Sequence, residues 1–253
     1  MFILVLWTAA SANTTLPYPE IQINVPSRTL QLFSNGHLIK EYPVGVGNNK
    51  NYMTPPGDYK VDLKVLNPIW EHPYRAPGES RIKSGSKNPL GTRWIGFHSE
   101  GSGVYGIHGT NQPNSVGHFV SHGCVRMHNS DVEELFELVQ IDTPVKVTYQ
   151  RFEISVEGSS IRLEFYPDPY QLGAIDRSEV LNSLKAISPY IQIDYEILQR
   201  ALSERSTEYI YEIATLIAPY QPIHSIQYQL QSPAPQNPSF PSYSSARSSY
   251  QFY

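Results

Sequence analysis

The feature that most restricts the fold of this sequence is a series of short apolar runs with a period of two, separated by turn-forming residues. In the first run Ile21, Ile23 and Val25 alternate with polar residues, which is typical of a half-buried strand. The pair Asn35-Gly36 separates the next two runs and favours a tight hairpin, because both of its residues tolerate a positive φ. The pattern predicts a mainly β domain.

One helix interrupts the predicted strands. Further strands are expected at residues 30–33, 37–42, 59–63, 94–97, 104–108 and 145–149. Ser130 and Glu133 form a capping-box pattern, which predicts that a helix begins there. Its apolar face would consist of Val132, Leu135, Phe136 and Val139. Residues 67–92 are rich in Pro, Gly and Ser and have no clear period, so we expect a long surface excursion.

The character of the chain changes after residue 149. Residues 152–156 and 161–165 predict a second hairpin, and apolar residues at helical spacings predict helical structure over residues 177–216. From residue 221 the composition is dominated by Pro, Ser, Gln and Tyr, which predicts a disordered tail. The expected organisation is an N-terminal segment (1–20), a mainly β domain (21–149), a hairpin-and-helix extension (150–220) and a disordered tail (221–253).

Composition excludes several classes of protein. The formal net charge is -4 and no basic stripe is present, which argues against a nucleic-acid binder. A single cysteine excludes a disulfide scaffold and a cysteine-rich zinc module. Phe2 to Trp7 is apolar and Ala10-Ser-Ala12 has the small-x-small form of a cleavage site, so we interpret the start as the remnant of an export signal, with a frayed terminus as the alternative. No run is long enough to predict a transmembrane span.

The single cysteine, Cys124, lies in a segment that is dense in reactive side chains. Two stretches stand out: Tyr105-Gly-Ile-His108-Gly-Thr-Asn111 and Ser121-His122-Gly123-Cys124-Val-Arg126-Met127. A cysteine attacks as its thiolate, and a nearby imidazole can take the proton to leave a thiolate–imidazolium pair. Histidines stand sixteen and two residues before Cys124, so the sequence predicts a nucleophile with a base in reach. Taken singly, Cys124 and His108 would more often be buried structural residues.

The neighbours of Cys124 suggest further roles. Gly123 would let backbone N–H groups approach a substrate carbonyl and form an oxyanion hole. In an extended segment Arg126 lies on the same face as Cys124, where it could bind a substrate carboxylate through two hydrogen bonds. A third group, either a carbonyl or a carboxylate, should accept the other N–H of the catalytic imidazole.

These residues resemble the catalytic domain of the L,D-transpeptidase family, also called the YkuD or ErfK-like family. Its signature is a histidine, a gap of about fifteen residues, then Ser/Thr-His-Gly-Cys and an Arg or Asn. The matching residues here run from His108 to Asn111 and from Ser121 to Arg126, and the resemblance covers residues 21–149. It extends through Val44–Gly47, Thr54–Gly57 and Asn88–Trp94.

The resemblance implies a YkuD-like β-sandwich with one helix after the catalytic cysteine. It implies that Cys124 is the nucleophile, that His108 is the proton donor and acceptor, and that the backbone carbonyl of Gly109 orients His108. It assigns His122 and Gly123 to the catalytic site and the oxyanion-hole region. The substrate-binding residues that it implies are Ser121, Arg126, Tyr105 and Asn111. No cofactor or metal is implied.

The implied reaction is attack on a peptidoglycan stem tetrapeptide, which loses its terminal D-Ala and leaves an acyl-thioester. The acceptor would be an amine of a second stem peptide or the lysine of an envelope protein, and water would make the site an L,D-carboxypeptidase. Such an enzyme would be exported to the periplasm or cell envelope. Two rivals remain: a catalytically silent peptidoglycan-binding module, and a zinc hydrolase that uses His98, His118 and His128 with the motif residues. The segment Phe165–Tyr170 resembles an ErfK-like extension to which we assign no function.

Overall fold

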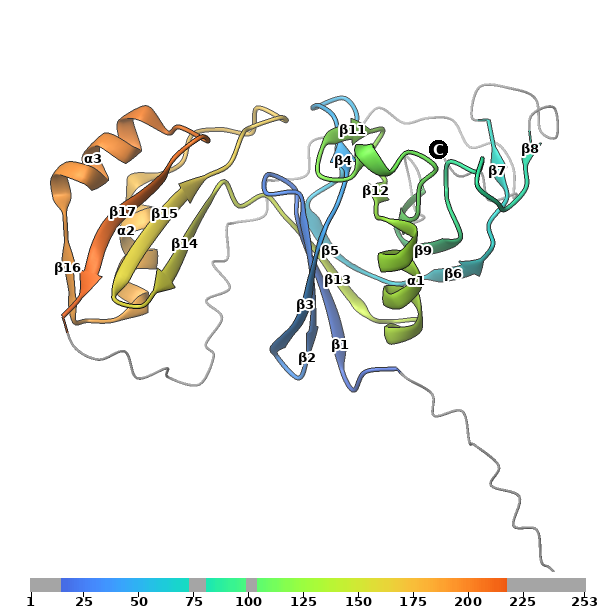
Figure 1. Cartoon of the computed structure of the whole chain (residues 1–253), viewed down its shortest axis with the longest axis horizontal. Helices are drawn as coiled ribbons and strands as arrows, with labels where there is room; N and C mark the ends of the chain where they lie inside the picture. Colours follow the sequence, from blue (N-terminus) through green and yellow to red (C-terminus); the bar gives the residue numbers. More distant parts are fainter. Residues whose placement is uncertain (1–14, 73–80, 99–103, 218–253) are drawn as a thin grey trace, which may run out of the picture.

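A computed structural model describes residues 15–72, 81–98 and 104–217 of the 253-residue chain, which form two units side by side (Figure 1). Residues 1–14 of the expected export-signal segment and the expected disordered tail lie outside the described residues. The first unit contains β1 (Pro19–Asn24), β2 (Thr29–Ser34), β3 (His37–Pro43), β4 (Val46–Gly47), β5 (Gly57–Lys60), β6 (Leu63–Leu66), β7 (Trp70–Glu71), β8 (Arg81–Ile82), β9 (Arg93–His98), β10 (Tyr105–His108), the 3-10 helix η1 (Pro113–Ser115), β11 (Phe119–Ser121), β12 (Val125–Arg126), α1 (Asn129–Leu138) and β13 (Pro144–Thr148).

The first large sheet of this unit has five strands in the order β3-β2-β1-β13-β5. The β2–β3 hairpin turns at Asn35 and Gly36, whose φ angles of 51° and 76° are those that a tight turn of this kind requires. Strand β1 pairs in parallel with β13, and Ile21 lies opposite Val145. The alternation predicted for β1 is confirmed, since Ile21 and Ile23 are fully buried.

The second large sheet has four strands in the order β12-β10-β9-β6, and β4 pairs with β11 in a separate two-stranded ladder. Apolar side chains from both large sheets share one core, to which Ile23 of β1, Ile95 of β9 and Ile107 of β10 contribute. The expected β-sandwich is therefore confirmed. Residues 67–72 and 81–92 contain more regular structure than expected, because β7 and β8 pair with each other and Leu90 is buried.

Helix α1 packs its apolar face on this core, with Val132 and Leu135 buried as predicted. The predicted capping box is wrong. The N-cap is His128, which lies outside the helix, whereas Ser130 is already inside it. The side chain of Glu133 does not return to the helix start but accepts a hydrogen bond of 2.6 Å from Thr92 Oγ1.

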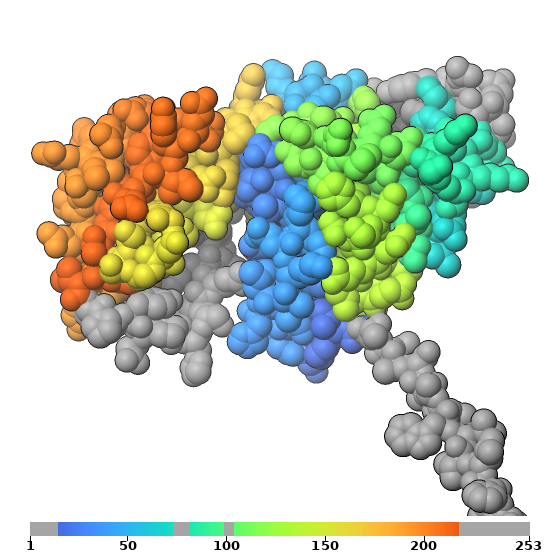
Figure 2. Space-filling view, in the orientation of Figure 1, coloured from blue at the N-terminus to red at the C-terminus, as the bar shows by residue number. Residues whose placement is uncertain are grey.

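The second unit is a four-stranded antiparallel sheet in the order β14-β15-β17-β16. It contains β14 (Phe152–Glu157), β15 (Ser160–Phe165), α2 (Arg177–Ile187), β16 (Ile191–Ile193), α3 (Tyr195–Glu204) and β17 (Ile210–Leu216). Side chains from its strands and helices form a separate hydrophobic core, which includes Leu163, Val180 and Leu198. In the space-filling view this unit lies beside the N-terminal strands of the first one (Figure 2).

The prediction for residues 177–216 is only partly correct. Helices α2 and α3 are present, but residues 191–193 and 210–216 are strands. Helix α3 ends at Arg205, whose φ is 45°. Beyond it Tyr211 and Ile213 are buried while Glu212 between them is exposed, which is the period of a strand. The extension is therefore an α+β unit, in which the predicted hairpin supplies two of the four strands of the sheet.

Candidate active site

The geometry of the candidate site begins with the parallel pair β10 and β12. Ile107 lies opposite Val125, and both side chains are fully buried in the core between the sheets. Successive side chains of a strand point to opposite faces. His108, which lies opposite Arg126, therefore points to the other face, and Cys124 lies two residues before Arg126 along the same chain. Cys124 clusters with Trp94, whose indole stacks on the His108 imidazole, so the thiol and the imidazole lie on the same face. The backbone of Gly106 hydrogen-bonds the thiol.

The turn that carries Cys124 is held by short hydrogen bonds. Ser121 Oγ accepts from the Gly123 backbone N–H at 3.0 Å and donates to the Cys124 carbonyl at 2.6 Å. Gly123 has a φ of 119°, and a Cβ at this position would lie 2.5 Å from the Tyr105 ring. No side chain other than hydrogen fits here, and the peptide bonds beside the thiol are fixed.

The orientation of His108 is fixed by its own neighbour. His108 Nδ1 lies 2.6 Å from the carbonyl oxygen of Gly109. Because a carbonyl oxygen only accepts hydrogen bonds, Nδ1 carries the proton and Nε2 is left as the basic atom. The imidazole stacks on the Trp94 indole, with 5.6 Å between ring centroids and an interplanar angle of 12°. The contact to Gly109 is the one that the sequence resemblance implied.

Burial determines the charge of both groups. It lowers the pKa of His108 to about 4, although the hydrogen bond with Gly109 opposes this shift, and the charge of Arg126 lowers the pKa further. Burial raises the pKa of Cys124 to about 11, while the Gly106 hydrogen bond and the charge of Arg126 act in the opposite direction. At neutral pH the resting site therefore holds a thiol and a neutral imidazole. Both shifts disfavour the thiolate–imidazolium pair expected from the sequence, because two charges would have to lose their hydration.

Asn129, at the start of α1, was not singled out from the sequence. Its side-chain amide pairs with the backbone of Thr110: Oδ1 accepts from the Thr110 N–H and Nδ2 donates to the Thr110 carbonyl, both at 3.1 Å. Thr110 follows Gly109, whose carbonyl holds His108. Asn129 thus fixes the segment that orients the imidazole. The only available signal was an Asn at a helix start, where such residues are common.

From the sequence, Thr54 was named only as part of the stretch Thr54–Gly57 through which the resemblance extends, and no role was assigned to it. Its side chain is buried, and Oγ1 donates a hydrogen bond of 2.8 Å to the carbonyl of Gly123, the residue before Cys124. The same oxygen accepts from the Gly47 N–H at 3.0 Å. Nothing in the local sequence distinguishes this role from that of an ordinary turn threonine.

The remaining predicted site residues differ in how close they lie to the thiol. Burial raises the pKa of Tyr105, as does the charge of Cys124, which places the phenol near the thiol. Arg126 is partly buried and interacts electrostatically with Cys124. His122 is exposed and makes an edge-on contact with Tyr52 at 4.4 Å between ring centroids. Asn111 is also exposed, and its side chain donates to the Lys87 carbonyl at 3.0 Å.

Within residues 15–72, 81–98 and 104–217 no group of three or more His, Cys, Asp or Glu side chains is arranged to hold a metal ion. None of the helices in that part of the chain has the length and apolar character needed to cross a membrane.

The chain is similar to several proteins of known sequence or structure. Over 133 residues the chain is 38% identical to the putative L,D-transpeptidase YqjB of Bacillus subtilis, and the alignment covers 51% of this chain and 71% of that protein. It is 28% identical over 206 residues to the probable L,D-transpeptidase YcfS of Escherichia coli, with 75% of this chain and 64% of YcfS covered. A crystal structure of L,D-transpeptidase 3 from Mycobacterium tuberculosis with a faropenem-derived adduct aligns with a TM-score of 0.43 and 20% identity, over 52% of this chain and 60% of the other. The family model of the YkuD L,D-transpeptidase catalytic domain matches residues 18–147, so the chain belongs to this family.

Proposed function

We propose that this protein is a peptidoglycan L,D-transpeptidase that works through an acyl-enzyme on Cys124. The observation that carries the proposal is the shared face of β10 and β12, where a buried thiol lies with a histidine whose tautomer is fixed by the Gly109 carbonyl. A nucleophile, a base and a group that orients the base are the minimum that acyl transfer by a cysteine requires. The family to which the chain belongs supports the same reaction class.

The first half of the reaction forms a thioester. Cys124 Sγ attacks the carbonyl that joins the third residue of a stem tetrapeptide to its terminal D-Ala. Since the resting thiol is protonated, its proton passes to His108 Nε2 as the S–C bond forms. The backbone N–H of Cys124 stabilises the oxyanion. His108 then gives the proton to the departing amine, the C–N bond breaks, and D-Ala leaves.

The second half regenerates the thiol. An amine of a second stem peptide or of an envelope-protein lysine attacks the thioester and gives a proton to His108. The C–S bond breaks, and the sulfur takes the proton back from His108. Water as acceptor would give an L,D-carboxypeptidase with the same first half-reaction. Because the substrate is wall peptide, we place the protein in the cell envelope, facing the wall.

Arg126 is the residue that we assign to substrate recognition. It lies opposite His108 on the neighbouring strand and is partly buried. A substrate anion that replaces water at its guanidinium would therefore form strong, charge-assisted hydrogen bonds. The terminal carboxylate of the tetrapeptide is such an anion. We place Tyr105, whose ring packs against Gly123, along the same substrate path, and we place Ser121, His122 and Asn111 at its margins.

The test is release of D-Ala from a purified tetrapeptide muropeptide, with intact mass after exposure to a carbapenem as a second readout. The wild-type protein should release D-Ala and gain the mass of one acyl group, and Cys124→Ala should do neither. His108→Ala should lose both activities, whereas His118→Ala, at an exposed position, serves as the matched control and should retain them. Wild-type protein that binds muropeptide without acylation would instead indicate a silent binding module. Product analysis of the same reaction identifies the acceptor.

A further inference from the structure

Tyr170 lies in the loop of residues 166–176, between β15 and α2 of the second unit, yet its side chain lies in the core of the first unit. We call this loop the joining segment because it packs back on the first unit. Tyr170 is 1% exposed and packs with residues of the two large sheets. Tyr149, at the end of the first unit, stacks on it with 5.2 Å between ring centroids. The ring is therefore an anchor that the joining segment inserts into the catalytic domain.

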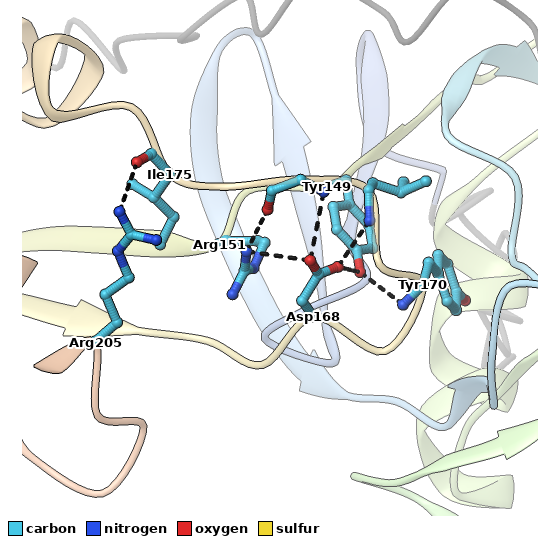
Figure 3. A network of polar contacts seen from close by, with 8 residues as sticks. Tyr149, Arg151, Asp168, Tyr170, Ile175 and Arg205 are labelled. Carbon is cyan, nitrogen blue, oxygen red and sulfur yellow. Dashed lines mark hydrogen bonds and ion pairs between the residues drawn. The ribbon is translucent and has the colours of Figure 1, made fainter. Parts of the chain in front are cut away.

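The joining segment is itself held by a carboxylate. Asp168 accepts a hydrogen bond of 2.6 Å from the Tyr149 hydroxyl and forms an ion pair of 3.2 Å with Arg151 (Figure 3). The Tyr149 hydroxyl in turn accepts from the Tyr170 backbone N–H at 2.9 Å. Arg151 Nη1 also donates to the carbonyl of Gly173 at 2.6 Å. Both ends of the segment are thus fixed around Tyr170.

The Tyr170 hydroxyl reaches the turn that contains Thr54. It accepts a hydrogen bond of 2.9 Å from the Thr54 backbone N–H, and both partners are buried. The space exists because residue 47 is a glycine: a Cβ there would lie 2.7 Å from the Tyr170 hydroxyl. A buried N–H that loses its acceptor is costly, so this contact fixes the position of Thr54.

Thr54 in turn contacts the residue that precedes Cys124. Its hydroxyl donates to the Gly123 carbonyl at 2.8 Å. In a planar trans peptide the C=O and the following N–H point in opposite directions. Fixing the Gly123 carbonyl toward Thr54 therefore aims the Cys124 N–H away from Thr54. That N–H is the donor that the proposed function assigns to the oxyanion.

We propose that Tyr170 is a positioning residue for acyl transfer, which acts through Thr54 and Gly123 to orient the oxyanion-binding N–H of Cys124. The joining segment is thereby part of the machinery of the catalytic domain. This inference rests on the proposed function, since it presumes that Cys124 forms an acyl-enzyme. Tyr170 itself touches no reacting atom.

The experiment uses the full chain and single-atom changes. Tyr170→Phe keeps the stacked ring and removes the hydroxyl, and Thr54→Val removes the donor to Gly123 at nearly constant volume. Thr54→Ser restores that donor and should rescue the loss. Tyr211→Phe is the matched control, because its hydroxyl bonds only within the second unit, to Glu204 at 3.0 Å. Thermal midpoints of all four variants monitor folding.

Two reactions of the same thiol separate positioning from general damage. D-Ala release and carbapenem acylation pass through an oxyanion, whereas alkylation by iodoacetamide does not. For Tyr170→Phe and Thr54→Val we expect kcat for D-Ala release to fall about tenfold, with KM and the alkylation rate within about twofold of wild type. Tyr211→Phe should match wild type in every rate.

Each alternative outcome is decisive. If wild type acylates but Tyr170→Phe acylates equally fast, the inference is overturned and the proposed function stands. If acylation and alkylation fall together, Tyr170 supports the fold in general and has no positioning role. If the wild-type protein neither acylates nor releases D-Ala, the proposed function fails and the inference fails with it.

Discussion

His108 is held neutral by folding, which makes the stability of the protein depend on pH. Burial lowers its pKa from 6.5 to about 4. Between these values the unfolded chain binds the proton more tightly than the folded chain does. The contribution of His108 to stability is therefore fully present above pH 6.5 and is lost as the pH falls toward 4. The loss amounts to about 2 kcal/mol by about pH 5 and about 3 kcal/mol by about pH 4.

The assay is urea unfolding at neutral pH and at about pH 5, followed by tryptophan fluorescence. His108→Gln removes the titration and keeps a side-chain amide that can donate to the Gly109 carbonyl. We expect wild type to lose about 2 kcal/mol more than this variant between the two conditions. His118→Gln, at an exposed position, should lose as much as wild type. Equal losses in wild type and His108→Gln would refute the argument that His108 is buried and neutral.

Three further predictions concern the neighbours of His108. Because the pKa of Cys124 is raised to about 11, its rate of alkylation by iodoacetamide should rise with pH well beyond 9; a rate independent of pH through neutrality would indicate a resting ion pair. Asn129→Ala removes both hydrogen bonds to Thr110 and should lower kcat for D-Ala release about tenfold; unchanged kcat would exclude a role in orienting His108. Gly106→Ala would put a Cβ within 2.6 Å of Trp94 Cε2 and should lower the free energy of unfolding by about 1–3 kcal/mol in urea titrations; a variant as stable as wild type would contradict this packing.

The sequence predicted those parts of the fold that depend on local geometry. Asn35-Gly36 specified the hairpin because few other pairs accept positive φ at both positions. The alternation of Ile21 and Ile23 with polar residues specified the buried face of β1, because successive side chains of a strand point to opposite faces. Residues 210–216 were missed because Ile210, Ile213 and Ala214 also fit a helical spacing. Only the neighbouring strands β15 and β16, which pair with β17, settle the choice.

The charge state of His108 and Cys124 could not be predicted from local sequence patterns. A histidine and a cysteine in one motif favour an ion pair if water reaches them, but here Cys124 clusters with Trp94 and Leu90, which exclude water. The contact between Thr54 and Tyr170 joins residues that are 116 positions apart. No spacing in the sequence indicates a pair this distant, and its role becomes visible only when the hydrogen bonds of Thr54 with Tyr170 and with Gly123 are followed in space.

The ring of Tyr170 sets a lower limit on how short this protein can be made. The family match ends at residue 147, but the hydrophobic interior does not end there. A version trimmed at Tyr149 for crystallisation or labelling would have an aromatic-sized hole in the core of the first unit, at a cost of about 3–5 kcal/mol if the walls do not collapse. Because the loop that carries Tyr170 follows β15, which pairs with β17, trimming should leave the chain intact through Leu216.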